Sequence, residues 1–255
     1  MKFWKDIGFE IEITADKSPT LRLLESVDPS KFRGESMHHS GGACAETLLI
    51  YGNPIRAILQ KVENPHFLVV GLGLGYIEMT IAREALLLKK SPDRVGLITS
   101  YDSVPELREF FFKWLHGDTS SMASEVVQTY EAVLDSLTSG TDIRKTEILS
   151  FLRHHFKHLQ DIKTALSSDV KLVSKYHCIL YDAFSSKTTP YLWDEEFLVQ
   201  LLREGSAEQC LLSTYACRVS LKQALSRAGF DVFVREGFQG KRNSTLGAKN
   251  IELNL

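Results

Sequence analysis

Hydrophobic and polar positions along this chain switch between two periods, and the switching predicts strands that alternate with helices. Residues 67–70 are a continuous apolar run, which is typical of a strand buried on both faces of a parallel sheet, and 177–181 also reads as a buried strand. Helical spacing is found from Tyr76 onward and over 104–116, 194–203 and 220–228. This order of elements predicts a doubly wound α/β fold with right-handed crossovers.

Four further segments complete the expected sheet. Residues 95–100 and 210–215 are apolar enough for buried strands, and residues 230–235 and 244–249 have the pattern of two strands joined as a hairpin. The chain contains no internal repeat.

The first sixty residues and the middle of the chain are less regular. Residues 20–24 and 46–51 alternate as short strands or a hairpin would, and 55–62 has helical spacing. Residues 125–137 and 143–166 both read as helices. We therefore expect a single domain over 1–255, with an N-terminal extension over 1–60 and a helical insertion over 117–175.

Composition excludes several classes of protein. With 44% hydrophobic and 24% charged residues among 255, the chain is not disordered. No apolar run reaches about 18 residues, and the first residues lack the apolar stretch of a signal peptide, so a cytoplasmic location is expected. A net charge of −2, from 30 basic and 32 acidic residues, argues against a general polyanion binder but leaves room for one basic face.

The four cysteines are scattered, and none has a histidine or a second cysteine at metal-ligand spacing. We expect reduced thiols and no metal site. They are Cys44, Cys178, Cys210 and Cys217.

Three strand ends carry residues suited to a nucleoside cofactor. Gly71, Gly73 and Gly75 follow the first buried strand, and glycines let a ligand approach the backbone beside a helix N-terminus. Asp102 follows the next strand, where a carboxylate can accept both ribose hydroxyls, and Asp182 ends the 177–181 strand. The loop lacks the later glycine of the dinucleotide fingerprint. Its absence favours a ligand with one nucleoside and a charged amino-acid tail over a dinucleotide with a pyrophosphate.

Several motifs resemble those of a known family, the methyltransferase domain of the bacterial tRNA-modification protein MnmC. The similar stretches are 42–53 (GACAETLLIYGN), 70–75 (VGLGLG), 100–105 (SYDSVP), 181–185 (YDAFS), 190–193 (PYLW), 213–215 (STY) and 228–242, which contains GF and GFQGKR. The resemblance implies a class I, Rossmann-like methyltransferase that uses S-adenosyl-L-methionine, with a mostly parallel seven-stranded sheet. It also implies N-methylation of the exocyclic amine of 5-aminomethyl-(2-thio)uridine at the tRNA wobble position.

The resemblance assigns roles to particular positions. It places Gly71, Gly73 and Gly75 against the cofactor, Asp102 on its ribose, and Asp182 as the catalytic residue beside the substrate amine. Glu46 and Asn53 match an upstream segment that forms part of the same pocket and are counted with the cofactor-binding residues. Phe184, Ser185 and Tyr215 are the substrate-binding candidates, and Phe238 is a weaker candidate for packing on the base. The partners implied are tRNA and an enzyme that supplies the aminomethyl group.

The sequence also departs from the family. The bifunctional proteins carry a flavin-dependent oxidase domain, whereas the chain resembles single-domain members. Apolar Val69 and Val70 replace an acid before the glycine loop, and the Gly-Asp pair expected to contact adenine has no counterpart in 151–168.

Basic residues of the insertion and the C-terminal region are the expected phosphate contacts. They are Arg144, Lys145, Arg153, His154, His155, Lys157, His158, Lys163, Arg235, Lys241 and Arg242. The histidines among them lack accompanying Cys or Glu at ligand spacing, which disfavours a metal.

Three other functions fit parts of the pattern. A methyltransferase acting on a small-molecule or protein amine would use the same pocket without tRNA. A non-catalytic scaffold that binds the cofactor would not need both Asp102 and Asp182. An aminopropyltransferase of the spermidine synthase type would need further acids for a polyamine, and the loop 183–189 has none.

Overall fold

A seven-stranded sheet runs through the centre of the molecule, in the order β5-β4-β3-β6-β7-β9-β8. The computed structural model describes residues 1–24, 34–167, 169, 171–240 and 243–252. Strands β3 to β7 are parallel, and β9 lies antiparallel between β7 and β8. The strands are β3 (Phe67–Val70), β4 (Ile98–Tyr101), β5 (Ile162–Lys163), β6 (Tyr176–Tyr181), β7 (Ser206–Thr214), β8 (Asp231–Arg235) and β9 (Ser244–Lys249).

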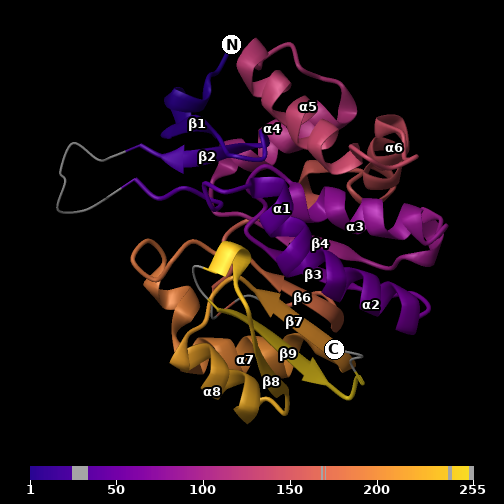
Figure 1. Ribbon diagram of the computed structural model, residues 1–255, viewed down its shortest axis with the longest axis vertical. Helices are drawn as coiled ribbons and strands as arrows, with labels where there is room; N and C mark the ends of the chain where they lie inside the picture. Colours follow the sequence, from indigo (N-terminus) through magenta and orange to yellow (C-terminus); the bar gives the residue numbers. More distant parts are fainter. Residues whose placement is uncertain (25–33, 168, 170, 241–242, 253–255) are drawn as a thin grey trace.

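Helices cover both faces of this sheet (Figure 1). Along β3, Phe67 and Val69 pack into one core and Leu68 and Val70 into the other, as successive side chains of a strand must. The first core contains α1 (Ala43–Thr47), α2 (Asn53–Lys61), α3 (Tyr76–Leu87), α4 (Pro105–His116), α5 (Ser124–Thr138) and α6 (Lys145–His155). The second contains α7 (Glu195–Gly205) and α8 (Val219–Arg227). A small hairpin of β1 (Phe9–Ile13) and β2 (Pro19–Leu23) adjoins the first core.

The structure confirms the expected α/β architecture. The strand predicted over 67–70 has those bounds, and the C-terminal hairpin is present, with its second arm inserted between β7 and β8. The helices predicted over 104–116, 125–137, 194–203 and 220–228 correspond to α4, α5, α7 and α8.

The prediction of a strand over 46–51 is wrong. Residues 43–47 form α1, and a π-helical segment, η2 (Leu48–Gly52), follows it. Buried positions at 43, 44, 47, 50 and 51 have helical spacing, which the apparent alternation concealed. The free N–H groups of α1 bond to side chains of the β1–β2 turn: Ala43 donates to Thr14, Cys44 to Ser18 and Ala45 to Asp16. Caps supplied from so far away along the chain leave no local signature.

The helix predicted over 143–166 is also too long. It ends at His155, and after a 3-10 turn the two residues of β5 pair with β4 as the edge strand of the sheet. The segment 117–175 is therefore not wholly helical, because it supplies one of the seven strands. No glycine or proline lies between α6 and β5 to mark the break.

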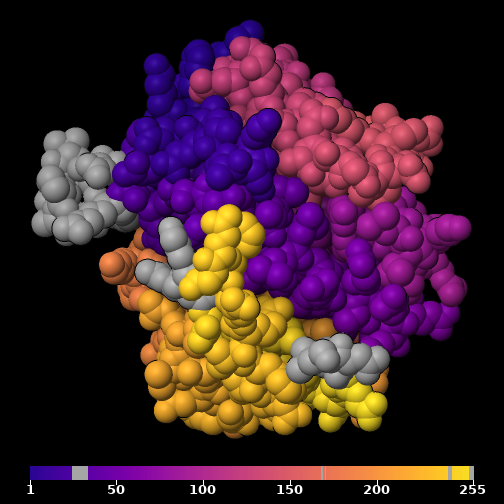
Figure 2. All heavy atoms as spheres, viewed as in Figure 1, coloured from indigo at the N-terminus to yellow at the C-terminus, as the bar shows by residue number. Residues whose placement is uncertain are grey.

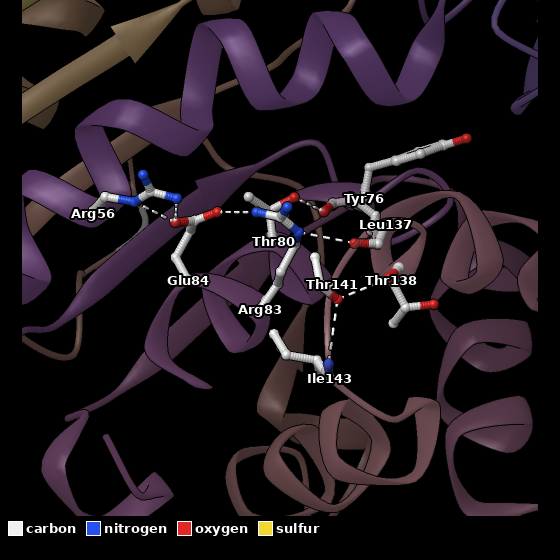
Figure 3. A network of polar contacts seen from close by, with 9 residues as sticks. All are labelled: Arg56, Tyr76, Thr80, Arg83, Glu84, Leu137, Thr138, Thr141 and Ile143. Carbon is white, nitrogen blue, oxygen red and sulfur yellow. Dashed lines mark hydrogen bonds and ion pairs between the residues drawn. The ribbon is translucent and has the colours of Figure 1, made fainter. Parts of the chain in front are cut away.

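A buried carboxylate connects three helices on the first face (Figure 3). Glu84 on α3 is 1% exposed and pairs with Arg56 of α2 at 2.6 Å and with Arg83. Arg83 also donates through Nε to the carbonyl oxygen of Leu137, near the end of α5, at 2.8 Å. The two guanidinium groups compensate the buried charge, and one of them satisfies a carbonyl that the end of α5 leaves free.

None of the helices in the described part of the chain combines the length and the apolar composition needed to cross a membrane.

Candidate active site

A cavity of about 550 Å³ opens at the carboxyl ends of β3, β4 and β6. This is where open α/β sheets bind ligands, and the volume lies in the range of about 300–1,000 Å³ typical of small-molecule sites. The segment 35–40, between β2 and α1, lines another wall. Phe238 lies against His39 with ring centroids 5.6 Å apart, so the C-terminal region (yellow) contacts the N-terminal segment (purple) across the front of the molecule (Figure 2).

The glycines of the loop serve different purposes. All three have positive φ, which favours glycine. A Cβ at Gly71 would lie 2.4 Å from the carbonyl oxygen of Asp182, and one at Gly75 would lie 2.3 Å from the Phe111 ring. A Cβ at Gly73 would meet only the Met37 sulfur, at 3.2 Å. Gly71 and Gly73 line the cavity, whereas the described lining does not include Gly75, so the latter is required by packing against α4.

Asp102 lies at the end of β4 and faces the glycine loop. Its Oδ2 accepts a hydrogen bond from Gly73 N at 3.0 Å, and its Oδ1 accepts one from Val104 N at 2.8 Å. Burial raises the pKa of Asp102, and these amides act against that rise by stabilising the carboxylate. Each oxygen keeps lone-pair capacity for a further donor, so the carboxylate can still accept ribose hydroxyls.

Asp182 lies at the end of β6 and is linked to the N-terminal segment. Tyr51 Oη, from η2, donates to Asp182 Oδ1 at 2.5 Å. The pKa of Asp182 is raised to about 7: burial raises it most, the Tyr51 hydrogen bond lowers it, and the nearby Glu46 charge raises it. Glu46 accepts from His39 N at 2.7 Å, and burial raises its pKa as well. Two carboxyl groups therefore share one end of the cavity.

Aromatic side chains line the cavity beside Asp182. Phe184 and Tyr215 both face it, and Tyr215 Oη donates to Ala183 O at 2.9 Å. Phe238 also lines the cavity, where it lies against His39. Ser185 is not among the lining residues; its N–H and hydroxyl both donate to Glu35, at 3.0 Å each. Ser185 therefore holds the loop and does not face the substrate space.

Asn53, like Gly75, is a predicted cofactor residue that does not line the cavity. Asn53 begins α2, and its side chain is exposed. Its neighbour Tyr51 faces the site instead, and the sequence reading missed it because the segment was taken for a strand.

Ala165 and Leu166 line the cavity beyond β5, next to Asp102 and Ser103. These apolar side chains occupy the region where the missing Gly-Asp pair was expected, and they can pack on a flat ring without a charged contact.

The predicted phosphate contacts do not form one group: Lys163 lies in β5 beside Tyr101, near the cavity, but several others lie elsewhere. His154 pairs with Asp93 at 3.4 Å, in the turn that precedes β4, so the end of α6 lies at the amino edge of the sheet, opposite the cavity. Lys145 pairs with Glu131 and Asp135. Arg235 is inside the fold and donates to Ser213 Oγ at 2.9 Å. Lys241 and Arg242 lie outside the described residues.

The comparison with protein families identifies the chemistry. Residues 123–250 match a family described as S-adenosyl-L-methionine-dependent methyltransferase. The chain belongs to this family. Its fold agrees with that of MnmC2 from Aquifex aeolicus, at a TM-score of 0.64 and 22% identity over 96% of the chain and 72% of the other. Spermidine synthase from Thermotoga maritima shares the fold more distantly, at a TM-score of 0.50 and 14% identity over 96% of the chain and 70% of the other.

Curated relatives of this methyltransferase include MnmC proteins. The tRNA 5-methylaminomethyl-2-thiouridine biosynthesis bifunctional protein MnmC of Leptospira interrogans is 29% identical over 71% of this chain and 26% of that protein. An uncharacterized protein of Methanocaldococcus jannaschii is 25% identical over 85% of this chain and 54% of that protein. The chain thus spans about half or less of the length of these relatives. It is a methyltransferase that uses S-adenosyl-L-methionine, and it is similar in sequence and fold to the MnmC proteins.

The cavity fits this cofactor. Because Gly73 has no side chain, the cavity beside its backbone stays open for the cofactor. The Asp102 carboxylate next to it can accept hydrogen bonds from the ribose hydroxyls. Within the described ranges, no group of three or more His, Cys, Asp or Glu side chains could hold a metal ion.

Proposed function

We propose that this methyltransferase N-methylates the exocyclic amine of 5-aminomethyl-(2-thio)uridine at the wobble position of tRNA. The observation that carries the proposal is the acidic end of the cavity, where Asp182 and Glu46 lie together beside Tyr51. An alkylammonium group is the natural ligand of such a pair, since each carboxylate can accept a hydrogen bond from one of its N–H groups. The names of the MnmC relatives support the choice of substrate.

Asp182 has two tasks in this reaction. The nucleophile must be the neutral amine, because an ammonium nitrogen has no lone pair to offer. With a pKa of about 7, the ionised Asp182 carboxylate can take a proton from the incoming ammonium group, and the resulting carboxylic acid can still accept a hydrogen bond from the neutral amine. Its neighbour Tyr51 fixes the position of the accepting oxygen.

Alignment supplies much of the remaining acceleration. Bound S-adenosyl-L-methionine supplies a methyl group on a positively charged sulfur. Asp102 and Gly73 would hold the cofactor at one end of the cavity, and Asp182 would orient the amine at the other. Holding reacting groups in line lowers a barrier by about 7–11 kcal/mol in favourable systems. Phe184 and Tyr215 would pack on the uridine ring, which must leave its stack to enter.

Mass spectrometry of tRNA nucleosides tests the proposal. A strain lacking this gene is expected to accumulate 5-aminomethyluridine or its 2-thio form, and the wild-type gene should restore the methylated nucleoside. A gene encoding Asp182→Asn should not restore it. Unchanged wobble nucleosides in the deletion strain would contradict the tRNA substrate and leave a small-molecule or protein amine as the acceptor. If tRNA is the substrate, another enzyme must first form the aminomethyl group on the wobble uridine. If the acceptor is a small-molecule or protein amine, no such enzyme is needed.

A further inference from the structure

Three side chains form a mixed aromatic and basic rim beside the cavity on the side of Asp182. Tyr191 lines the cavity and is 46% exposed, although its neighbours Leu192 and Trp193 are buried. Lys187 is exposed, four residues earlier in the same loop. Arg218 is partly exposed; it donates to Ser186 Oγ, and its guanidinium lies 5.4 Å from the Trp193 ring centroid.

Hydrogen bonds fix the turn of the rim that carries Tyr191. Tyr181 Oη donates to Leu192 O at 2.5 Å, and Trp193 Nε1 donates to Phe184 O at 2.7 Å. Ser220 Oγ, on α8, donates to Trp193 O at 2.8 Å. The turn that carries Tyr191 is thus tied to β6, to the loop after it and to α8, so the backbone that bears this exposed ring is fixed, and the ring itself lies against Phe197 with centroids 6.3 Å apart. Binding to a preformed surface avoids part of the cost of ordering side chains.

The acidic side chains near the rim keep their charge but are engaged in contacts within the protein. The Glu35 carboxylate accepts hydrogen bonds from Ser185 and Thr188. Asp194 caps the first turn of α7, and Glu195 and Glu196 pair with Arg227. The acids of this region therefore have partners, whereas Lys187 extends into solvent.

We propose that Tyr191, Lys187 and Arg218 form a docking surface for single-stranded RNA, with Tyr191 stacking on a nucleobase next to the target nucleotide. The inference deepens the proposed function and depends on it for the identity of the target. Aromatic rings stack on unpaired bases of any sequence, and flanking Lys and Arg side chains bind phosphates, which is how proteins commonly hold single-stranded RNA. Tyr191 lies at the rim, whereas Phe184 and Tyr215 adjoin Asp182, so a neighbouring base is the one it can reach.

Fluorescence anisotropy with a wobble-uridine anticodon stem-loop tests the surface without turnover. Tyr191→Ala should weaken RNA affinity about tenfold, and Tyr191→Phe should retain it because a phenyl ring also stacks. Lys187→Ala should reduce the slope of log affinity against log salt by about one. Lys157→Ala, beyond the end of α6 at the opposite edge of the sheet, is the matched control and should bind as the wild type does. In steady-state assays with tRNA, Tyr191→Ala should raise KM much more than it lowers kcat.

The outcomes separate this inference from the proposed function. Wild-type affinity in Tyr191→Ala, or an equal loss in Lys157→Ala, would overturn the docking surface even if tRNA is methylated. Tyr191-dependent RNA binding with unchanged wobble nucleosides in the deletion strain would support the surface and reject the wobble substrate. If the wild-type protein shows no affinity for the stem-loop, the docking surface is wrong.

Discussion

Tyr51 and Asp182 are 131 residues apart in the chain, and a hydrogen bond of 2.5 Å joins them. It connects the helical segment before the glycine loop to the end of β6. The phenol keeps its proton, because burial and the Asp182 charge hold the pKa of Tyr51 well above its usual value. Tyr51 is therefore a fixed donor that stabilises the ionised form of Asp182.

Tyr51→Phe should move the pH dependence of methyl transfer. The hydrogen bond lowers the pKa of Asp182, so its loss raises that pKa above about 7. Activity that needs the carboxylate then appears at higher pH, and the acidic limb of kcat/KM shifts upward. The measurement is a pH–rate profile of both proteins. Tyr215→Phe, whose hydroxyl bonds Ala183 O instead, should leave the limb in place. Identical limbs in Tyr51→Phe and the wild type would contradict the role of the hydrogen bond.

Asp182→Asn should lower kcat by about 10²–10⁴, the range seen when a positioned proton acceptor is removed. The amide cannot take a proton from the ammonium group. Cofactor affinity, measured by calorimetry, should stay close to that of the wild type, whereas Asp102→Asn should weaken it. The reverse pattern, with cofactor binding lost in Asp182→Asn, would show that Asp182 holds the cofactor instead.

Glu84→Ala should destabilise the fold by about 2–4 kcal/mol, because it leaves the Arg83 and Arg56 guanidinium groups without their buried partner. Urea unfolding measures the loss. The exposed pair of Arg94 and Glu63 provides the control, and Glu63→Ala should change stability by less than about 1 kcal/mol. Equal effects of the two substitutions would mean that burial of the Glu84 network contributes nothing.

Glu78→Gln should stabilise the protein increasingly as the pH rises from about 4.5 to 8. Glu78, on α3, is fully buried; its Oε1 accepts from Ser100 Oγ at 2.6 Å, and its Oε2 has no hydrogen-bond partner. Burial raises the pKa of Glu78 to about 8. The unfolded chain releases this proton near pH 4.5 and the folded chain only near pH 8, so the wild type loses stability across that window. Glutamine has no proton to lose, and its amide oxygen can still accept from Ser100.

Unfolding free energies of wild type and Glu78→Gln at several pH values provide the test. The difference between them should grow up to about pH 8 and then level off. A constant difference over the whole range would mean that Glu78 titrates as an exposed carboxyl does.

Six of the seven strands of the central sheet could be predicted because each carries its own signal, whereas the two residues of β5 carry none. Apolar runs such as 67–70 need no distant partner to be recognised, and the acids at strand ends follow from them. Asp102 and Asp182 could thus be placed in one cleft before their contacts were known. What could not be predicted depends on distant groups, such as the caps that Thr14, Asp16 and Ser18 provide for α1.

The basic residues show a second limit of the sequence. Charge along a helix says nothing about which edge of the sheet the helix end will meet. The ion pair of His154 with Asp93 places the end of α6 away from the cavity, while Arg218, which belongs to no run of charge, lies beside Trp193 near it. Tertiary contacts, not local composition, decide where a positive side chain can act.

The segment from Glu35 to Gly52 supplies one wall of the cavity, whereas all seven strands of the central sheet follow it in the chain. A shortened chain that began at Asn53 would retain all seven strands, the glycine loop and Asp102. It would lack Glu46, Tyr51 and the wall formed by 35–40, so Asp182 would face open water with neither its donor nor its acidic neighbour. In the proposed reaction, selectivity for an amine therefore depends on this N-terminal segment and not on the strands that carry the glycine loop and Asp102.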